Sequence, residues 1–344
     1  MDIAIVGYGF VGQALVQLIY DTKDRLRNED IDPNIKYVIN SKGGIYNPNG
    51  INLKNFIKFT NMDKDINLYN EDSTINVTFT DLIREKDVDI VIEMTPTNLN
   101  TGEPGLSHIT KSLSNGIHVI TANKGPILLA YDELYKIAKE NNVQLGIGCT
   151  TGGALPSINS GIVELAGSKI TSIVGILNGT TNFILEEMEK NGIEYREALK
   201  KAQKLGIAES DPTLDVKGFD TASKLLILTN ILMKTNKSIE DIQLRGIDSI
   251  NLSDIKEMAS INKRYKLIGK SILSKGQVQI SVKPEIIDAN DSFYNVSGKD
   301  KAVQYSSDTL GDFTIIGGAS GVVAAAASIL RDLININRGY QYIK

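Results

Sequence analysis

The sequence predicts an α/β protein with an N-terminal, doubly wound parallel sheet and a second domain of the α+β class. Two observations support this prediction. Over residues 1–150, apolar β-rich runs alternate with helical patterns, which is typical of a parallel sheet covered by helices. From about Thr151 longer helices and later strands replace this alternation. The expected parts are therefore a first domain at 1–150, a second domain at 151–312, and a C-terminal segment at 313–344 that packs back on the first domain.

A glycine-rich turn lies near the start of the chain, between a strand and a helix. The apolar run Ile3–Val6 precedes Gly7-x-Gly9-x-x-Gly12, and an apolar helical pattern follows. In a dinucleotide-binding turn, the first glycine permits the tight turn and the second lets the backbone approach the pyrophosphate. The third allows the helix to pack closely on the strand. The turn therefore predicts a Rossmann-type dinucleotide-binding domain.

The end of the second strand bears on the choice of cofactor. This strand is expected at Lys36–Asn40, and an NAD site usually places Asp or Glu at its end to hold the ribose hydroxyls. Here the chain reads Asn40-Ser41-Lys42-Gly43, with a cation and no carboxylate. NADPH is therefore predicted to be favoured over NADH, with Ser41 and Lys42 near the 2′-phosphate. The alternative is that Lys42 is a solvated loop residue.

The remaining strands of the first half indicate where a ligand binds. Strands are expected at 88–95, 117–123 and 143–149, and a helix over 131–142. In a parallel sheet of this kind, ligands bind beyond the carboxyl ends of the strands. Three places meet that condition: Thr95-Pro96, Asn123-Lys124-Gly125 and the glycine-rich turn after Cys149. The segment 46–80 is interpreted as an insertion that carries no recognisable chemistry.

The second half carries its own strands and helices. Strands are expected at 168–177, 278–287 and around 301–306, and helices at 178–192, 195–206 and 218–233. Asn178 or Thr180 is the expected cap of the first of these helices. A late glycine-rich turn, 317–321, precedes an alanine-rich helix, which is expected to fold back on the nucleotide domain.

Composition excludes several classes of protein. Hydrophobic residues make up 42% of the 344 residues and charged residues 23%, as in globular proteins. The net charge of −4 and the lack of a basic block argue against a nucleic-acid partner. The late apolar run 321–330 is too short to span a bilayer, and no charged n-region opens the chain. Cys149 is the only cysteine, so no intrachain disulfide can form. A cytoplasmic protein with a small-molecule substrate is expected.

A cluster of carboxylates leads into an apolar helix that carries a lysine. Asp220 and Lys224 are four residues apart and so share one helix face. A lysine desolvated beside a carboxylate can donate a proton to a reacting carbonyl. Glu209 and Asp215 remain available for a cationic group, such as a substrate ammonium. The alternative is a capped helix with an ordinary i,i+4 salt bridge.

The stretch AQKLGIAESDPTLDVKGFDTASK (202–224) is similar to the signature of homoserine dehydrogenases at every defining position. The resemblance extends to the glycine-rich opening, the Asn123-Lys124 turn, GGALP at 152–156, NGTTNFIL at 178–185 and the late glycine-rich turn. It implies a homodimeric, monofunctional enzyme without a kinase or C-terminal regulatory domain. Such enzymes use NAD(P)H to reduce aspartate 4-semialdehyde to homoserine, in the branch leading to threonine, methionine and isoleucine.

The resemblance also implies roles for individual residues. Lys224 resembles the proton donor, Asp220 its partner and Glu209 the residue that binds the substrate amine. Lys124 resembles the lysine that lies against cofactor and substrate. Further substrate contacts are expected at Asp215 and Thr180, and the cofactor contacts are expected at Gly7, Gly9, Phe10, Val11, Gly12, Ser41, Lys42, Thr95 and Gly318.

One departure from the family and two alternatives remain. Gly148 replaces a glutamate that many members carry beside a monovalent cation, and no metal site is predicted, although nearby carbonyls (Thr151, Gly153 and Leu155) could bind a cation. A Cys149-dependent semialdehyde dehydrogenase would need a histidine base, but both histidines, His108 and His118, lie upstream. A non-catalytic NADPH-binding protein is the second alternative.

Overall fold

The structure is a computed structural model that describes residues 1–62 and 64–342, and it divides into two compact units. The first unit consists of Met1–Thr150 together with the chain from Gly321 onward, and the second of Thr151–Ser320. The chain therefore returns to the first unit at Gly321. The sequence had predicted this return at residue 313. The reason is that β13 (Asp312–Gly317) pairs along its length with β12 (Lys301–Ser307) in the sheet of the second unit.

The first unit contains the predicted doubly wound sheet, with strand order β4-β3-β2-β1-β5-β6-β7. Its parallel strands are β1 (Asp2–Val6), β2 (Asn34–Asn40), β5 (Ile90–Glu93), β6 (His118–Thr121) and β7 (Leu145–Gly146). Two antiparallel strands beyond β2, β3 (Gly43–Tyr46) and the edge strand β4 (Thr74–Ile75), were not predicted. The segment 46–80 also contributes α2 (Leu53–Thr60) and the short η1 (Ile66–Leu68), so it extends the nucleotide domain beyond β2.

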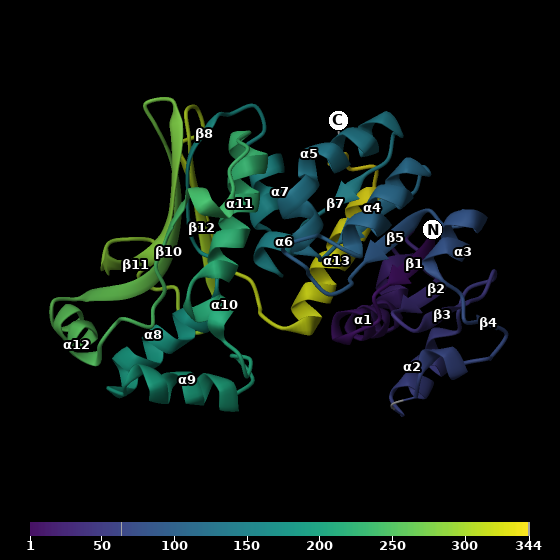
Figure 1. Ribbon diagram of the computed structural model, residues 1–344, viewed down its shortest axis with the longest axis horizontal. Helices are drawn as coiled ribbons and strands as arrows, with labels where there is room; N and C mark the ends of the chain where they lie inside the picture. The colour runs from purple at the N-terminus through teal and green to yellow at the C-terminus, as the bar shows by residue number, and fades with distance from the viewer. Residues whose placement is uncertain (63, 343–344) are drawn as a thin grey trace. The chain divides into compact units, whose positions relative to one another are not determined.

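Helices cover this sheet, and the C-terminal helix is one of them (Figure 1). They are α1 (Phe10–Arg27), α3 (Phe79–Glu85), α4 (Gly105–Ser114), α5 (Lys124–Glu140) and α13 (Val322–Asn337). α13 packs against α1 and buries Ile329 and Leu333 in the same core as Leu15 and Val16. The expectation that the tail folds back on the nucleotide domain is thus confirmed. Asp332 of α13 accepts a hydrogen bond from the Gly148 N–H at 2.7 Å, which fixes the chain after β7.

The second unit is built on a six-stranded sheet of order β13-β12-β8-β10-β11-β9. Its remaining strands are β8 (Ile170–Ile176), β9 (Ile242–Leu244), β10 (Lys263–Ser274) and β11 (Gln277–Asp288). Every neighbouring pair is antiparallel except β11 with β9, and β10 with β11 forms a long hairpin. The short α6 (Cys149–Gly152) connects the first unit to the second along the chain. The helices of the second unit are α7 (Ser157–Val163), α8 (Gly179–Asn191), α9 (Tyr195–Lys204), α10 (Thr213–Val216), α11 (Phe219–Met233), η2 (Ile239–Asp241) and α12 (Leu252–Ser260).

Two helices of this unit are positioned by local sequence signals. Asn178 caps α8, since its Oδ1 accepts from the Thr181 N–H at 2.9 Å, and Gly192 ends the helix in the left-handed region. Gly218 precedes α11 with φ of +88°, and a Cβ there would lie only 3.1 Å from a Leu244 methyl. Glycine thus lets α11 begin close against β9. None of the helices in the described part of the chain combines the length and the apolar composition that a bilayer-spanning segment requires.

Candidate active site

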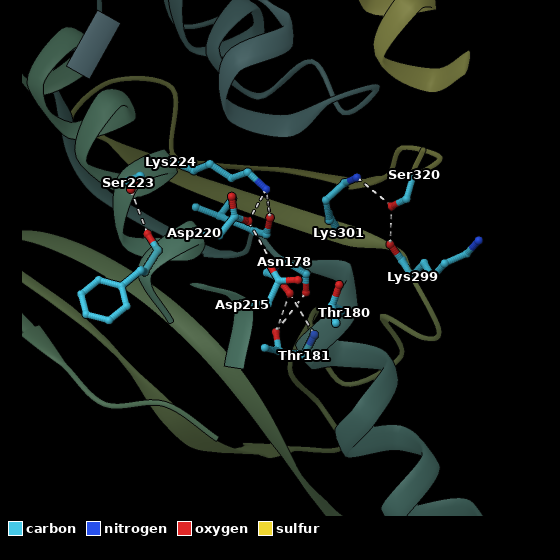
Figure 2. Close-up of polar contacts among 12 residues, drawn as sticks. Asn178, Thr180, Thr181, Asp215, Asp220, Ser223, Lys224, Lys299, Lys301 and Ser320 are labelled. Atoms are coloured by element: carbon cyan, nitrogen blue, oxygen red, sulfur yellow. Dashed lines mark hydrogen bonds and ion pairs between the residues drawn. The ribbon is translucent and has the colours of Figure 1, made fainter. Parts of the chain in front are cut away.

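Lys224, Asp220 and Asp215 form a hydrogen-bonded cluster with Asn178 in the second unit (Figure 2). Lys224 Nζ lies 2.6 Å from Asp220 Oδ2 and donates to the Leu177 carbonyl at 3.0 Å. The two charged side chains are only 16% and 14% exposed. The i,i+4 contact predicted from the sequence is confirmed, and the pair is more enclosed than an ordinary surface salt bridge.

Asn178 joins the two aspartates of this cluster. Its Nδ2 donates to Asp215 Oδ1 at 2.6 Å and to Asp220 Oδ2 at 2.9 Å, while its Oδ1 caps α8. Burial raises the pKa of Asp215, and the neighbouring Asp220 charge raises it further, against the hydrogen bonds of Asn178 and Thr180. The sequence identified Asn178 only as a helix cap, so its place in the cluster is a new feature.

Two further predicted substrate residues, Thr180 and Glu209, lie near this cluster along the chain, but they differ in exposure. Thr180 is buried, and its hydroxyl donates to the Ile207 carbonyl at 3.1 Å. This bond ties the first turn of α8 to the loop that carries Glu209. The Glu209 side chain itself is exposed, while its carbonyl accepts from Gln203 Nε2 at 3.1 Å. Glu209 is therefore accessible to a cationic group.

Two glycine-rich turns meet elsewhere in the second unit. A Cβ on Gly318, whose φ is +79°, would lie 2.6 Å from the backbone nitrogen of Leu155 in the GGALP segment. Lys301, at the start of β12, is 5% exposed and donates to Ser320 Oγ at 3.2 Å (Figure 2). Its Nζ would be 3.8 Å from a Cβ on Gly153. Lys301 thus lies beside both turns, and no sequence pattern had singled it out.

The first unit holds a large cavity at the carboxyl ends of β1, β2 and β5. Its volume is about 1790 Å³. The residues of the glycine-rich turn fit a bound dinucleotide. Gly7 has φ of +102°, and a Cβ there would lie 2.4 Å from the Met94 carbonyl carbon, so only glycine is tolerated. Gly12 is equally restricted, because its Cβ would lie 2.8 Å from the Gly7 oxygen. At Gly9 no described atom lies within 4 Å of the Cβ position, so the backbone borders open space where α1 begins.

Most predicted cofactor residues line this cavity, including Gly7, Gly9, Phe10, Val11, Gly12, Ser41, Lys42 and Thr95. Lys124 and Gly318 are not among its described lining residues, and Gly318 belongs to the second unit. The segment 46–80 also contributes to the wall, through Thr60, Lys64, Asp65, Ile66, Asn76, Thr78 and Phe79. The segment interpreted as an insertion without chemistry therefore forms one side of the cavity.

A buried carboxylate orders the edge of the sheet next to the cavity. Glu93 is fully buried at the end of β5 and accepts from the Thr95 N–H at 2.9 Å and from the Thr121 hydroxyl at 2.9 Å. Burial raises its pKa, although the hydrogen bonds from Thr95 oppose this. Asn123 donates to the Thr95 carbonyl at 3.2 Å and caps α5, which begins at Lys124. Glu93 was missed because a single carboxylate in an apolar strand gives no pattern.

A dinucleotide cavity in one unit and an enclosed lysine–carboxylate pair in the other define the chain as an NAD(P)-dependent oxidoreductase. The family model described as "Homoserine dehydrogenase, NAD binding domain" matches residues 7–147, and the model described as "Homoserine dehydrogenase" matches residues 156–334. The chain therefore belongs to the homoserine dehydrogenase family.

Whole-chain relatives agree with this assignment. The homoserine dehydrogenase of Methanocaldococcus jannaschii is 39% identical over 98% of both chains. The NAD(+)-dependent homoserine dehydrogenase of Pseudomonas canavaninivorans is 34% identical over 98% of this chain and 96% of its own. A hyperthermophilic archaeal homoserine dehydrogenase mutant, solved in complex with NADPH, superposes with a TM-score of 0.83 at 26% identity, covering 100% of this chain and 99% of its own.

The family assignment overturns both alternatives that the sequence left open. Cys149 is 9% exposed and starts the short α6 instead of ending a strand, and its sulfur lies 3.7 Å from the Ala325 carbonyl. It is therefore a core residue of the first unit. A binding protein without catalysis is likewise not the class to which the chain belongs.

Proposed function

We propose that this chain catalyses the reversible, NAD(P)H-dependent reduction of L-aspartate 4-semialdehyde to L-homoserine, with Lys224 as the proton donor. The observation that carries the proposal is the Lys224 ammonium, held 2.6 Å from Asp220 and 3.0 Å from the Leu177 carbonyl in a partly enclosed cluster. These two contacts leave one of its three N–H groups for a third acceptor, such as an aldehyde oxygen.

The residues of this chain bind and orient the substrate and the cofactor, and they protonate the aldehyde oxygen. A bound NAD(P)H supplies the hydride that reaches the aldehyde carbon. Lys224 donates its proton to the aldehyde oxygen, and Asp220 holds the ammonium in position through their 2.6 Å contact. Asp215 and the exposed Glu209 offer carboxylates to the substrate ammonium, with Thr180 as a further polar contact. Lys124, at the start of α5, is proposed to contact cofactor and substrate, and Gly318 the cofactor.

The direct test is NADPH oxidation at 340 nm with aspartate semialdehyde, with homoserine measured as product. Stoichiometric formation of homoserine would support the proposed reaction. Binding of NADPH without oxidation would mean that the chain acts on another carbonyl substrate.

NADPH is the cofactor we propose to be favoured. Ser41, Lys42 and Lys64 all line the cavity where β2 ends, so two cations border the place of the ribose 2′-phosphate. A relative named as NAD(+)-dependent shows that family membership alone does not fix the preference.

The Lys42→Ala variant is expected to raise the Michaelis constant for NADPH about tenfold, because a phosphate loses a charged hydrogen-bond partner. The constant for NADH should not change. Steady-state kinetics with both cofactors measures this, with Lys58→Ala as the control for net charge, since Lys58 is exposed on α2 and does not line the cavity. Equal effects on NADH and NADPH would contradict the assignment.

The Gly9→Ala variant is expected to weaken NADPH binding about tenfold or more while leaving the melting temperature unchanged. Gly9 has φ of −94°, which alanine tolerates, and its Cβ would meet no described atom. The methyl group would occupy only the space through which a pyrophosphate approaches the backbone. Calorimetric titration and thermal unfolding measure the two quantities. Gly7→Ala is the contrasting variant, because strain there should lower stability as well.

We further propose a cytoplasmic homodimer that serves threonine, methionine and isoleucine biosynthesis, with no nucleic-acid or membrane partner. Exposed isoleucines on two strands of the second sheet, Ile272 and Ile316, lie on the same face and support dimerisation. Sedimentation velocity on the whole chain tests the oligomeric state. A monomer at micromolar concentration would exclude the dimer.

A further inference from the structure

His108 is a cavity-lining residue that the proposed function has not used. It lies in the first turn of α4, and its ring packs against Phe79 with the centroids 4.2 Å apart and the planes inclined by 42°. Both rings line the dinucleotide cavity. No hydrogen bond joins the imidazole to another described residue, and its Nδ1 atom is buried. A half-buried imidazole without a partner requires an explanation, because buried polar groups are normally paired.

The location of this pair within the cavity indicates which part of a dinucleotide it would meet. The ribose of the adenosine half lies at the end of the second strand in this fold. That place is occupied here by Ser41, Lys42 and Gly43. A Cβ on Gly43 would lie 3.5 Å from the Asn76 Cα, and Asn76 is three residues before Phe79. The aromatic wall is therefore continuous with the ribose end of the cavity, which is where the base attached to that ribose must go.

We infer that Phe79 and His108 form the adenine subsite, in which a ring nitrogen of His108 accepts a hydrogen bond from the adenine 6-amino group. This inference rests on the proposed use of NADPH. Phe79 supplies an apolar face for the base, and a neutral imidazole has one nitrogen that accepts. Burial lowers the pKa of His108, which favours the neutral form, although Glu103 opposes the effect and Lys111 adds to it. His108 is thus a specificity-determining residue for adenine over a base without a 6-amino group.

The test compares NADPH with deamino-NADPH, whose hypoxanthine base carries oxygen in place of the 6-amino group. By isothermal titration, the wild-type chain should bind NADPH about five-fold tighter, as one neutral hydrogen bond allows. His108→Phe, which keeps an aromatic ring and removes the acceptor, should bind both cofactors equally. Ser114→Ala is the matched control, because Ser114 is exposed on the same helix and does not line the cavity. It should keep the wild-type ratio.

A second readout separates a lost base contact from general damage. Reduced nicotinamide mononucleotide lacks the adenosine half, so His108→Phe and the wild type should use it with equal kcat/KM. An unchanged NADPH to deamino-NADPH ratio in His108→Phe, or a parallel fall with the mononucleotide, would overturn the inference. His108→Leu, also without an acceptor, serves if the phenylalanine variant does not fold. Since the titrations need no semialdehyde, an absence of turnover in the wild type would count against the proposed function alone.

Discussion

The Lys224→Ala variant is expected to reduce aspartate semialdehyde with a turnover number about 10²–10⁴-fold below the wild-type value, the usual contribution of a positioned general acid. The structure gives Lys224 two fixed acceptors, Asp220 Oδ2 and the Leu177 carbonyl, so its ammonium is held in one direction. Water in the variant would have to protonate the oxygen without that alignment. NADPH affinity should be unchanged, because the dinucleotide cavity is formed by residues of the other unit.

Lys217→Ala is the matched control for this experiment. Lys217 belongs to the same stretch, but it is 51% exposed and pairs with Asp248 at the surface. Its loss should leave turnover within about two-fold of wild type, since exposed ion pairs contribute little. Added methylamine should partly restore Lys224→Ala if only the proton donor is missing. Near-normal turnover in Lys224→Ala would remove Lys224 from the proposed role.

Sequence patterns predicted the fold where one face of an element is apolar, and they failed where a charged residue is buried. The doubly wound sheet, α8 and α11 follow regular patterns and were found close to their observed bounds. β10 was missed because lysine and arginine interrupt its apolar residues. Lys266 in that strand is 3% exposed, and its ammonium donates to Asn182 Oδ1 at 2.8 Å and to the Val296 carbonyl at 2.6 Å. Those acceptors are distant from Lys266 in the sequence, so no local sequence pattern predicts that this lysine is buried.

The candidate site shows the same division between local and distant contacts. Asp220 and Lys224 could be paired from their i,i+4 spacing alone. Asn178 could not be joined to them, because 37 residues separate it from Asp215 and 42 from Asp220. Lys64 was missed for a related reason. It comes from a polar segment without periodicity, and only the fold of β3 and α2 brings that segment to the cavity.

The Asp215→Asn variant is expected to lose about 10–100-fold in kcat/KM, the effect of removing a charged partner from a hydrogen bond with a substrate ammonium. The loss should appear mainly as a higher Michaelis constant for the semialdehyde, because no hydrogen bond joins Asp215 to Lys224 in the described structure and Asp215 does not line the cofactor cavity. The amide oxygen of asparagine can still accept from Asn178 Nδ2. The variant therefore removes the charge and keeps the local hydrogen bond.

The same variant is expected to be more stable than wild type at neutral pH. Burial and the Asp220 charge raise the folded-state pKa of Asp215 above its ordinary value of 3.8. A raised carboxyl pKa means that the folded chain holds the proton more tightly than the unfolded chain. The protonated Asp215 carboxyl therefore makes its full contribution to the free energy of unfolding below pH 3.8. This contribution is lost as the pH rises through the folded-state pKa. At neutral pH the ionised Asp215 costs stability, and asparagine removes that cost.

Urea unfolding of both chains at pH 7.5 and at acidic pH measures this effect. The advantage of Asp215→Asn should be present at pH 7.5 and shrink as the pH falls. Asp211→Asn is a control of opposite sign, because hydrogen bonds from Thr213 lower the pKa of the exposed Asp211, so its charge favours the folded state. A variant that is less stable at both values would mean that Asp215 supports the fold. A more stable variant with a raised Michaelis constant would support the proposed role of Asp215. It would mean that Asn178 holds Asp215 beside Asp220 at a cost in stability, and that this arrangement binds the substrate ammonium.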